Sequence, residues 1–307
     1  MTKNILIIGG TRFFGKLLVR RLLAEGHQLT LATRGRTGDD FGGAVQRIHV
    51  DRRDAAAMRD AFARASYDVV YDQMCYSPLD AAISNEVFAG RTARYIMSST
   101  IEVYRHLCGS GRAPFAEAAL DLDAERIDMA YPWHDPAYAE ESYAPGKRQA
   151  EALLYRAAAL PSVRIAHVLG GCDDFTGRLR HYVELARLGQ PLPHSRNAAA
   201  SSFLHPQAIA DFLAWTGMQD FLGPVNAANI TLSAPALQQR IGQVLGVSAH
   251  ARAAASSAVQ PGPFDYALPY TMDTARAAAL GHHFEGDGVW LDALIREHAA
   301  AAQGAAA

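Results

Sequence analysis

Cysteines, long apolar runs and metal-binding patterns are scarce in this sequence. Its 307 residues include three cysteines, Cys75, Cys108 and Cys172, an odd number scattered along the chain. Such a set predicts no disulfide framework, and no CxxC pair is present to bind zinc. The HExxH pattern of zinc proteases and any run of about 18 apolar residues are also missing. We therefore expect a reduced, cytoplasmic protein with no metal site and no membrane segment.

An excess of charge of either sign is missing too. Lysine and arginine number 29 and aspartate and glutamate 31, which gives a formal net charge of −2. Proteins that bind nucleic-acid backbones present a basic surface, so we expect no nucleic-acid partner. Hydrophobic residues make up 50% of the chain and charged residues 20%, which supplies enough apolar material for a buried core.

The first half of the chain alternates short apolar runs with amphipathic segments of about 10 to 15 residues. This alternation is typical of βαβ units and predicts an α/β fold with a doubly wound parallel sheet of the Rossmann type. After residue 105 the rhythm breaks, and we expect a long functional loop to about residue 136. The expected strands are Ile5–Ile8, Gln28–Thr33, Gln46–Val50, Tyr67–Asp72, Arg94–Ser98 and Val163–Leu169.

A glycine-rich turn lies between the first expected strand and the first expected helix. It reads Gly9-Gly10-Thr11-Arg12-Phe13-Phe14-Gly15. A phosphate approaches backbone N–H groups closely only where no Cβ intervenes, and the start of a helix adds free N–H groups and a positive dipole. The turn therefore predicts a dinucleotide site, with Gly9, Thr11, Arg12, Phe13, Phe14 and Gly15 as candidate contacts.

The end of the second expected strand indicates which dinucleotide is bound. NAD sites usually place an acidic residue there for the ribose 2′-hydroxyl, whereas NADP sites place an arginine for the 2′-phosphate. Here the strand runs into Arg34-Gly35-Arg36, and no acidic residue stands at this edge. The planar guanidinium of Arg34 matches phosphate oxygens well. We expect NADP, with NAD as the alternative cofactor.

The catalytic candidates are Tyr143 and Lys147, which are four residues apart on an expected helix and so share one face. A phenol with a pKa of about 10 is a poor base at neutral pH. A nearby ammonium favours the phenolate and lowers that pKa, so the tyrosine can exchange a proton with an alcohol or carbonyl oxygen.

The glycine turn, the segment Ser98-Ser99-Thr100-Ile101-Glu102-Val103-Tyr104 and the motif Tyr143-Ala-Pro-Gly-Lys147 together resemble the extended short-chain dehydrogenase/reductase superfamily, in its NAD-dependent epimerase/dehydratase family. The resemblance runs from about Ile5 to Phe212. The Gly-Gly-Thr-Arg-Phe form of the turn is similar to the branch that contains chloroplast stem-loop-binding proteins. The family usually has a third glycine where Arg12 stands.

This resemblance implies roles for further residues. Thr100, counted back from Val103-Tyr104, matches the hydroxyl that orients the substrate oxygen, although Ser99 stays open as a rival. Glu102 matches the base of 4,6-dehydratases. Asp51 matches an acid that faces adenine. Further cofactor contacts are expected from Arg52, Gln73, Ser98 and Lys147.

The resemblance also implies that different parts of the chain bind the cofactor and the substrate. Residues 1–169 form the dinucleotide-binding domain and residues 203–230 return to it. Residues 170–202 and 231–307 form a smaller α/β region that binds the substrate. Family members often form homodimers through the helix that carries the tyrosine, and here Ala150 and Leu154 offer an apolar face.

Three functions remain open from the sequence. The first is an NADP(H)-dependent oxidoreductase that acts on a carbonyl or secondary alcohol of a small molecule, with Tyr143 as acid and base. The second is a sugar-nucleotide epimerase or 4,6-dehydratase with Glu102 as base. The third is a non-enzymatic dinucleotide sensor or RNA-binding relative. Ser201 and Ser202 stand where nucleotide-sugar enzymes carry an arginine for the diphosphate, which favours a different substrate.

Overall fold

The computed structural model describes residues 1–253 and 262–304. The chain divides into two compact units. Unit 1 contains residues 1–105, 117–165 and 209–226, and unit 2 contains residues 106–116, 166–208 and 227–307. These units differ from the expected division at residues 106–116, 166–169, 203–208 and 227–230, all of which fall in unit 2. The roles expected of the two regions stay predictions.

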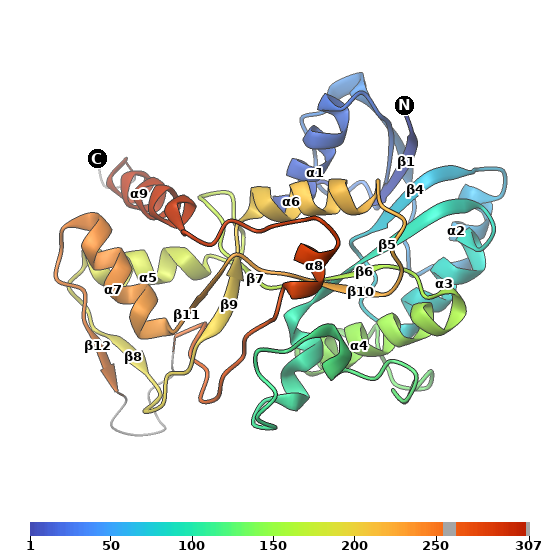
Figure 1. Cartoon of the computed structure of the whole chain (residues 1–307). Helices are drawn as coiled ribbons and strands as arrows, with labels where there is room; N and C mark the ends of the chain where they lie inside the picture. Colours follow the sequence, from blue (N-terminus) through green and yellow to red (C-terminus); the bar gives the residue numbers. More distant parts are fainter. Residues whose placement is uncertain (254–261, 305–307) are drawn as a thin grey trace. The chain divides into compact units, whose positions relative to one another are not determined.

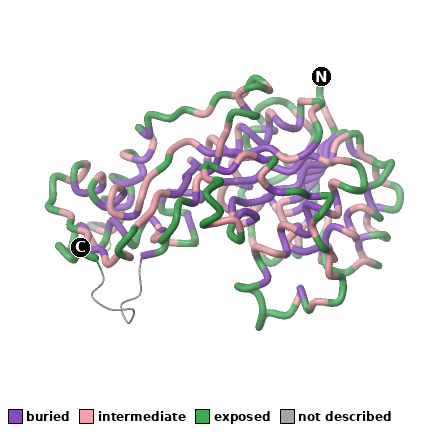
Figure 2. The backbone as a smooth tube through the Cα atoms, turned by 60° about the horizontal axis from the view of Figure 1, so that its bottom comes forward, coloured by how far each residue is buried: buried purple, intermediate pink, exposed green. Residues whose placement is uncertain are grey.

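A seven-stranded sheet forms the centre of unit 1, in the order β10-β6-β5-β4-β1-β2-β3 (Figure 1). The pairings from β3 across to β6 are all parallel. Its central strands are almost wholly buried, as the purple segments of Figure 2 show. The strands are β1 (Asn4–Ile8), β2 (Gln28–Thr33), β3 (Val45–His49), β4 (Tyr67–Asp72), β5 (Thr92–Thr100), β6 (Ser162–Ile165) and β10 (Pro224–Ala227).

Helices cover both faces of this sheet (Figure 1). Helices α1 (Phe13–Ala24) and α6 (Pro206–Thr216) lie on one face, and α2 (Ala55–Phe62), α3 (Pro78–Phe88) and α4 (Ala139–Ala158) on the other. Local sequence explains several of the starts. Asp54 caps α2, and Ser77 caps α3 with Pro78 at its first position. The doubly wound Rossmann-type fold expected from the sequence is confirmed.

The connections of the sheet place a topological switch point between β1 and β4. From β1 the chain moves outward through β2 to β3, and it then returns to β4 on the other side of β1. In open α/β sheets, ligands bind outside the carboxyl ends of the strands at such a point. The glycine turn follows β1 and Gln73 follows β4, so both lie at this edge.

Unit 2 has its own core. It contains a three-stranded sheet, β11-β9-β7, and a parallel pair, β12-β8. Leu179, Leu237 and Ile295 are buried in one apolar cluster of helices α5, α7 and α9. The elements are β7 (His167–Val168), α5 (Arg178–Arg187), β8 (Leu192–His194), β9 (Ser201–Leu204), β11 (Ile230–Leu232), α7 (Ala234–Leu245), β12 (Ala251–Ala253), α8 (Ala275–Ala279) and α9 (Val289–Gly304).

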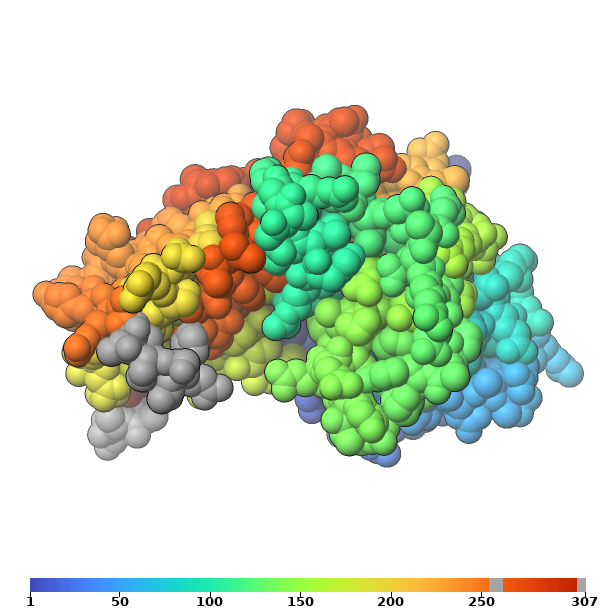
Figure 3. Space-filling model, turned by 90° about the horizontal axis from the view of Figure 1, so that it is seen from below, coloured from blue at the N-terminus to red at the C-terminus, as the bar shows by residue number. Residues whose placement is uncertain are grey.

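Two local expectations need correction. The single strand expected at Val163–Leu169 is two short strands, β6 and β7, which belong to different sheets. The expected loop at 105–136 contains short 3₁₀ helices at its start and at Glu117–Ala119, and a third at Pro136–Tyr138 follows it. The first turn of α4, Ala139–Glu141, is exposed. This part of the chain is green in Figure 3, where green segments form part of the visible surface.

The helix expected to serve a dimer contact is packed within unit 1. Ala150 is fully buried and Leu154 is 2% exposed, and both belong to the apolar cluster beneath the sheet. These side chains pack against the chain's own core. Within the described residues, no helix is both long and apolar enough to cross a membrane.

Candidate functional site

The glycine turn has the backbone geometry that a phosphate-binding turn requires. Gly9 has φ +106° and Gly10 φ +88°, where residues with a Cβ are strained. A Cβ on Gly15 would lie 3.1 Å from the Cα of Gly10, so this glycine allows α1 to pack close to the turn. No side chain caps the start of α1, which leaves its N-terminus available to an anion.

The other predicted residues of the turn are spread around it. Thr11 lines a neighbouring pocket, and Arg12 is exposed at the N-cap of α1. Phe13 and Phe14 pack against each other with ring centroids 5.7 Å apart, and Phe13 adopts φ 51°, which is unusual for a bulky residue. Thr11 thus lies at a pocket, while the contacts of Arg12 and of the two rings with a dinucleotide stay predictions.

Gln73 lies over the glycine turn. Its Oε1 would be 2.5 Å from a Cβ on Gly15 and 3.5 Å from one on Gly9. Its Nε2 is buried and has no hydrogen-bond partner. A buried amide donor without a partner is costly, and a phosphate oxygen at the turn would satisfy it. This orphaned donor, together with the glycine cradle, fits the pyrophosphate of a dinucleotide.

A pocket of about 210 Å³ opens beside the carboxyl end of β2. Its lining includes Thr11 and Thr33, and also Asp39, an acidic residue that the sequence analysis did not place at this edge. The carboxylate of Asp39 binds Arg47 through two hydrogen bonds, of 2.5 and 3.1 Å, which lowers its pKa. Arg34, by contrast, is exposed at the end of β2, adjacent to this lining.

Lys147 extends inward from α4 to the end of β5. Its Nζ donates a hydrogen bond of 2.8 Å to the carbonyl oxygen of Ser98, and the residue is only 3% exposed. Burial lowers the pKa of this lysine to about 8, although Cys75, Asp72 and Asp80 oppose the shift. The hydroxyl of Ser98 is buried and has no hydrogen-bond partner.

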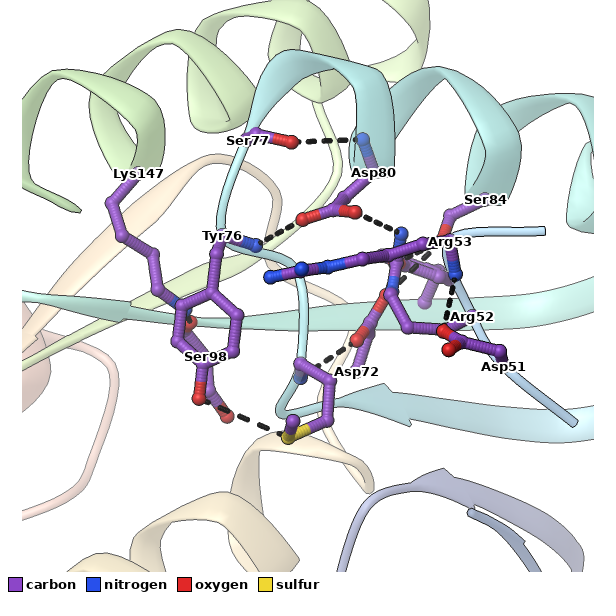
Figure 4. A network of polar contacts seen from close by, with 12 residues as sticks. Asp51, Arg52, Arg53, Asp72, Tyr76, Ser77, Asp80, Ser84, Ser98 and Lys147 are labelled. Atoms are coloured by element: carbon purple, nitrogen blue, oxygen red, sulfur yellow. Dashed lines mark hydrogen bonds and ion pairs between the residues drawn. The ribbon is translucent and has the colours of Figure 1, made fainter. Parts of the chain in front are cut away.

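One tyrosine ring, that of Tyr76, lies beside this lysine, and the ring of Tyr143 lies beside that of Tyr76. Tyr143, on α4, is 37% exposed, and its ring centroid is 6.1 Å from that of Tyr76. The ammonium of Lys147 lies 4.3 Å from the centroid of the Tyr76 ring (Figure 4). Burial, and then the neighbouring Tyr143, raise the pKa of Tyr76 far above its usual range. Tyr76 is therefore a poor proton donor or acceptor near neutral pH, and the proton exchange expected of Tyr143 stays a prediction.

The structure separates the two rival hydroxyls at the end of β5. Ser99 donates a hydrogen bond of 3.0 Å to Glu151, whose carboxylate also binds the buried Arg164 at 2.9 Å. The Thr100 hydroxyl instead accepts the backbone N–H of Glu102 at 3.3 Å and keeps its own proton available. Thr100 is thus the better candidate to orient a substrate. The Glu102 carboxylate forms an ion pair of 3.4 Å with Arg105.

Arg52 does not lie where the resemblance placed it. Its guanidinium is buried and binds Asp72 at 2.5 Å, Asp80 at 3.1 Å and Ser84 at 2.8 Å (Figure 4). We therefore withdraw the expected cofactor contact of Arg52, because two carboxylates already occupy its guanidinium. Asp51 is partly exposed and accepts the backbone N–H of Arg53 at 3.1 Å, so its contact with adenine stays a prediction.

Three important residues escaped the sequence analysis. Tyr76 lies in a loop with no periodicity, and Asp39 stands six residues beyond the end of β2. Asp80 was not singled out, although it is completely buried. A charged residue on the buried face of a helix is the one signal that could have identified Asp80 in advance.

A parallel sheet with a glycine turn at its switch point, and a tyrosine and lysine one helical turn apart, defines the class of Rossmann-type dinucleotide-binding proteins. Residues 5–119 match the model of the NAD dependent epimerase/dehydratase family. The family resemblance seen in the sequence is thereby confirmed for this segment.

A curated relative matches over a shorter stretch. The chain is 40% identical over 83 residues to the chloroplast stem-loop binding protein of 41 kDa b of Arabidopsis thaliana. This match covers 23% of the chain and 22% of that protein, so the chain spans about a fifth of the length of the relative.

Solved structures resemble nearly the whole chain. The Bordetella bronchiseptica enzyme WbmG, in complex with NAD and UDP, has a TM-score of 0.71 at 18% identity, with 98% of this chain and 94% of that chain covered. UDP-glucose 4-epimerase of Thermotoga maritima, with UDP-glucose, has a TM-score of 0.70 at 15% identity, with 99% and 100% covered. At such identities these comparisons establish the fold.

Proposed function

We propose that the protein is an NADP(H)-dependent oxidoreductase that transfers hydride to or from a carbonyl or secondary alcohol of a small organic molecule. One observation carries the proposal. Lys147, whose buried ammonium is fixed on the Ser98 carbonyl at the end of β5, follows Tyr143 by one turn of α4. This arrangement supplies a charge that stabilises a phenolate.

Different residues of the chain would bind the dinucleotide and transfer the proton. The glycine turn, Thr11 and the Gln73 amide would hold the pyrophosphate. The bound dinucleotide supplies the hydride donor or acceptor. Thr100 would orient the substrate oxygen, Tyr143 would give it a proton or take one from it, and Lys147 would favour the charged form of that phenol.

Arg34 supports the phosphorylated dinucleotide. It is exposed at the end of β2, whereas the one acidic residue lining the adjacent pocket, Asp39, is already paired with Arg47. A guanidinium without a competing carboxylate suits a 2′-phosphate. NAD, which several structural neighbours contain, remains the alternative cofactor.

A small organic substrate is favoured over a nucleotide sugar by the two serines of β9. The Ser201 hydroxyl donates to the carbonyl of Tyr270 at 2.8 Å, and the Ser202 hydroxyl accepts the N–H of Met272 at 3.0 Å. Both residues are completely buried within unit 2. Neither can replace the arginine that neutralises a diphosphate.

The direct test uses NADPH and a panel of small aldehydes and ketones. We expect the absorbance of NADPH to fall with turnover, and the Tyr143→Phe variant to lose this activity while it still binds NADPH. If the purified protein binds neither NADPH nor NADH in a fluorescence titration, the proposal is wrong.

The second candidate is an epimerase or 4,6-dehydratase, because the matched family and the structural neighbours carry these names. Glu102 would then act as the base of a dehydratase. Such an enzyme restores its cofactor in each cycle, so NADPH absorbance would show no net change while a nucleotide sugar is converted. The Glu102→Gln variant would lose dehydration and keep dinucleotide binding.

RNA binding is the third candidate, because the curated relative is named a stem-loop binding protein. The net charge of −2 opposes it. We propose that small molecules are the partners. Retention of RNA in a gel-shift assay at physiological salt would contradict this.

A further inference from the structure

The ring of Tyr76 covers one side of the Lys147 ammonium. The ammonium has two described neighbours: the Ser98 carbonyl oxygen at 2.8 Å and the face of the Tyr76 ring at 4.3 Å. A cation over an aromatic face is attracted to it, and more strongly when water is excluded. Figure 4 shows the lysine side chain descending beside this ring.

The backbone of Tyr76 is fixed, whereas the polar contact of its hydroxyl is weak. Its N–H donates to Asp80 at 2.8 Å, and its carbonyl oxygen would lie only 2.4 Å from a Cβ on Gly146 of α4. Its hydroxyl contacts the sulfur of Met74 at 3.8 Å, which is a weak acceptor. Among the described contacts, no strong side-chain hydrogen bond therefore opposes displacement of the ring while the loop backbone stays in place.

The loop after β4 thus places three side chains along one route. Gln73 lies on Gly15, Met74 packs 3.2 Å from the position of a Cβ on Gly9, and Tyr76 covers Lys147. A dinucleotide whose pyrophosphate sits at the glycine turn must pass this loop to bring its nicotinamide end to Tyr143. The ring and that end of the ligand compete for one ammonium.

We propose that Tyr76 is a positioning residue: its ring holds and covers the Lys147 ammonium, and a bound dinucleotide displaces the ring from it. This inference rests on the proposed function, because it requires the nicotinamide end to reach Lys147. According to this inference, the Tyr76 ring weakens cofactor binding, whereas the other side chains of the loop do not.

The experiment compares the wild-type protein with Tyr76→Phe, Tyr76→Leu and Tyr76→Ala. The first keeps the aromatic face, the second keeps apolar volume without it, and the third removes both. The readouts are the dissociation constant for NADPH by fluorescence titration and the rate at which acetic anhydride acetylates Lys147, followed by peptide mass spectrometry. Circular dichroism checks the fold of each variant.

We expect Tyr76→Leu and Tyr76→Ala to acetylate at Lys147 roughly tenfold faster and to bind NADPH roughly tenfold more tightly, the scale of one cation–π contact. Tyr76→Phe should match the wild type within about twofold, and NADPH should slow acetylation in every folded variant.

Two results would overturn the inference, and they differ from each other. If the wild type binds NADPH but the Leu and Ala variants acetylate no faster or bind more weakly, the ring is ordinary packing and the proposed function is untouched. If no variant and neither dinucleotide shows binding, the proposed function fails and the displacement fails with it.

Discussion

The two ends of the candidate site differ in how they are prepared for a ligand. At the β2 end, a pocket of about 210 Å³ is lined by Thr11, Thr33 and other short or polar residues. At the α4 end, Lys147 is only 3% exposed, and an aromatic ring lies on its ammonium. One end is open and polar, and the other is closed and desolvated.

This contrast follows from the chemistry required at each end. Recognition of phosphates and ribose needs donors that reach solvent-exposed anions, and cations such as Arg34 remain hydrated there at little cost. Proton transfer needs a charge in a dry environment, where an ammonium acts strongly on a nearby phenol. The buried charge at the α4 end therefore lowers the stability of the folded protein, whereas the exposed charges at the β2 end do not.

The largest effect should come from the phenol at the closed end. Tyr143→Phe removes the group that exchanges a proton, so we expect turnover to fall by about 10²- to 10⁴-fold. The ring that faces Tyr76 is kept, so the NADPH dissociation constant should change by less than about twofold. Steady-state kinetics and a fluorescence titration measure the two quantities separately.

Tyr138→Phe is the matched control, because Tyr138 is 40% exposed and immediately precedes α4. Equal losses in both variants would mean that the effect is not specific to Tyr143.

The next effect concerns the cost of the buried charge. The pKa of Lys147 falls from 10.5 in the unfolded chain to about 8 in the folded state. At neutral pH this shift disfavours folding by on the order of 3 kcal/mol. Lys147→Met removes that cost but also the bond to Ser98, worth about 1 kcal/mol. We expect the variant to be about 2 kcal/mol more stable at pH 7, and inactive.

The direction in which the stability difference changes with pH tests whether the buried Lys147 charge is its cause. Between pH 8 and 10.5 the unfolded wild-type chain binds a proton at Lys147 that the folded chain does not, so wild-type stability gains relative to the variant as pH rises. Urea unfolding at pH 7 and about pH 10 measures this change. A stability gain that stays constant with pH, or that Lys16→Met at the surface reproduces, would rule out the buried charge as its source.

Sequence reasoning succeeded where periodicity or fixed spacing determined the outcome. The parallel sheet followed from alternating apolar runs, and Tyr143 and Lys147 could be placed on one helix because residues four apart share a face. The glycines of the turn were identified because positive φ values favour that residue. Each of these inferences depends on contacts that are local in the chain.

The remaining features depend on contacts between distant segments. Arg52 stands in a segment with the composition of a surface loop. Its side chain is nevertheless enclosed by Asp72, Asp80 and Ser84 from β4 and α3. Tyr76 reaches Lys147 only because the loop after β4 packs against α4, some 70 residues later in the chain. No pattern in one segment reports such a pairing, so the contact of Tyr76 with Lys147 could not be predicted, although Tyr143 and Lys147 themselves were.

The smallest effect should come from the open end, where solvent screens every charge. If Arg34 binds the 2′-phosphate, Arg34→Ala should weaken NADPH binding about 5- to 10-fold, and should change NADH binding by less than about twofold. The difference should shrink as salt rises, because the contact is exposed. Arg59→Ala, whose side chain pairs with Glu86 on the surface, is the matched control. Equal weakening of both dinucleotides would show that Arg34 does not read the 2′-phosphate.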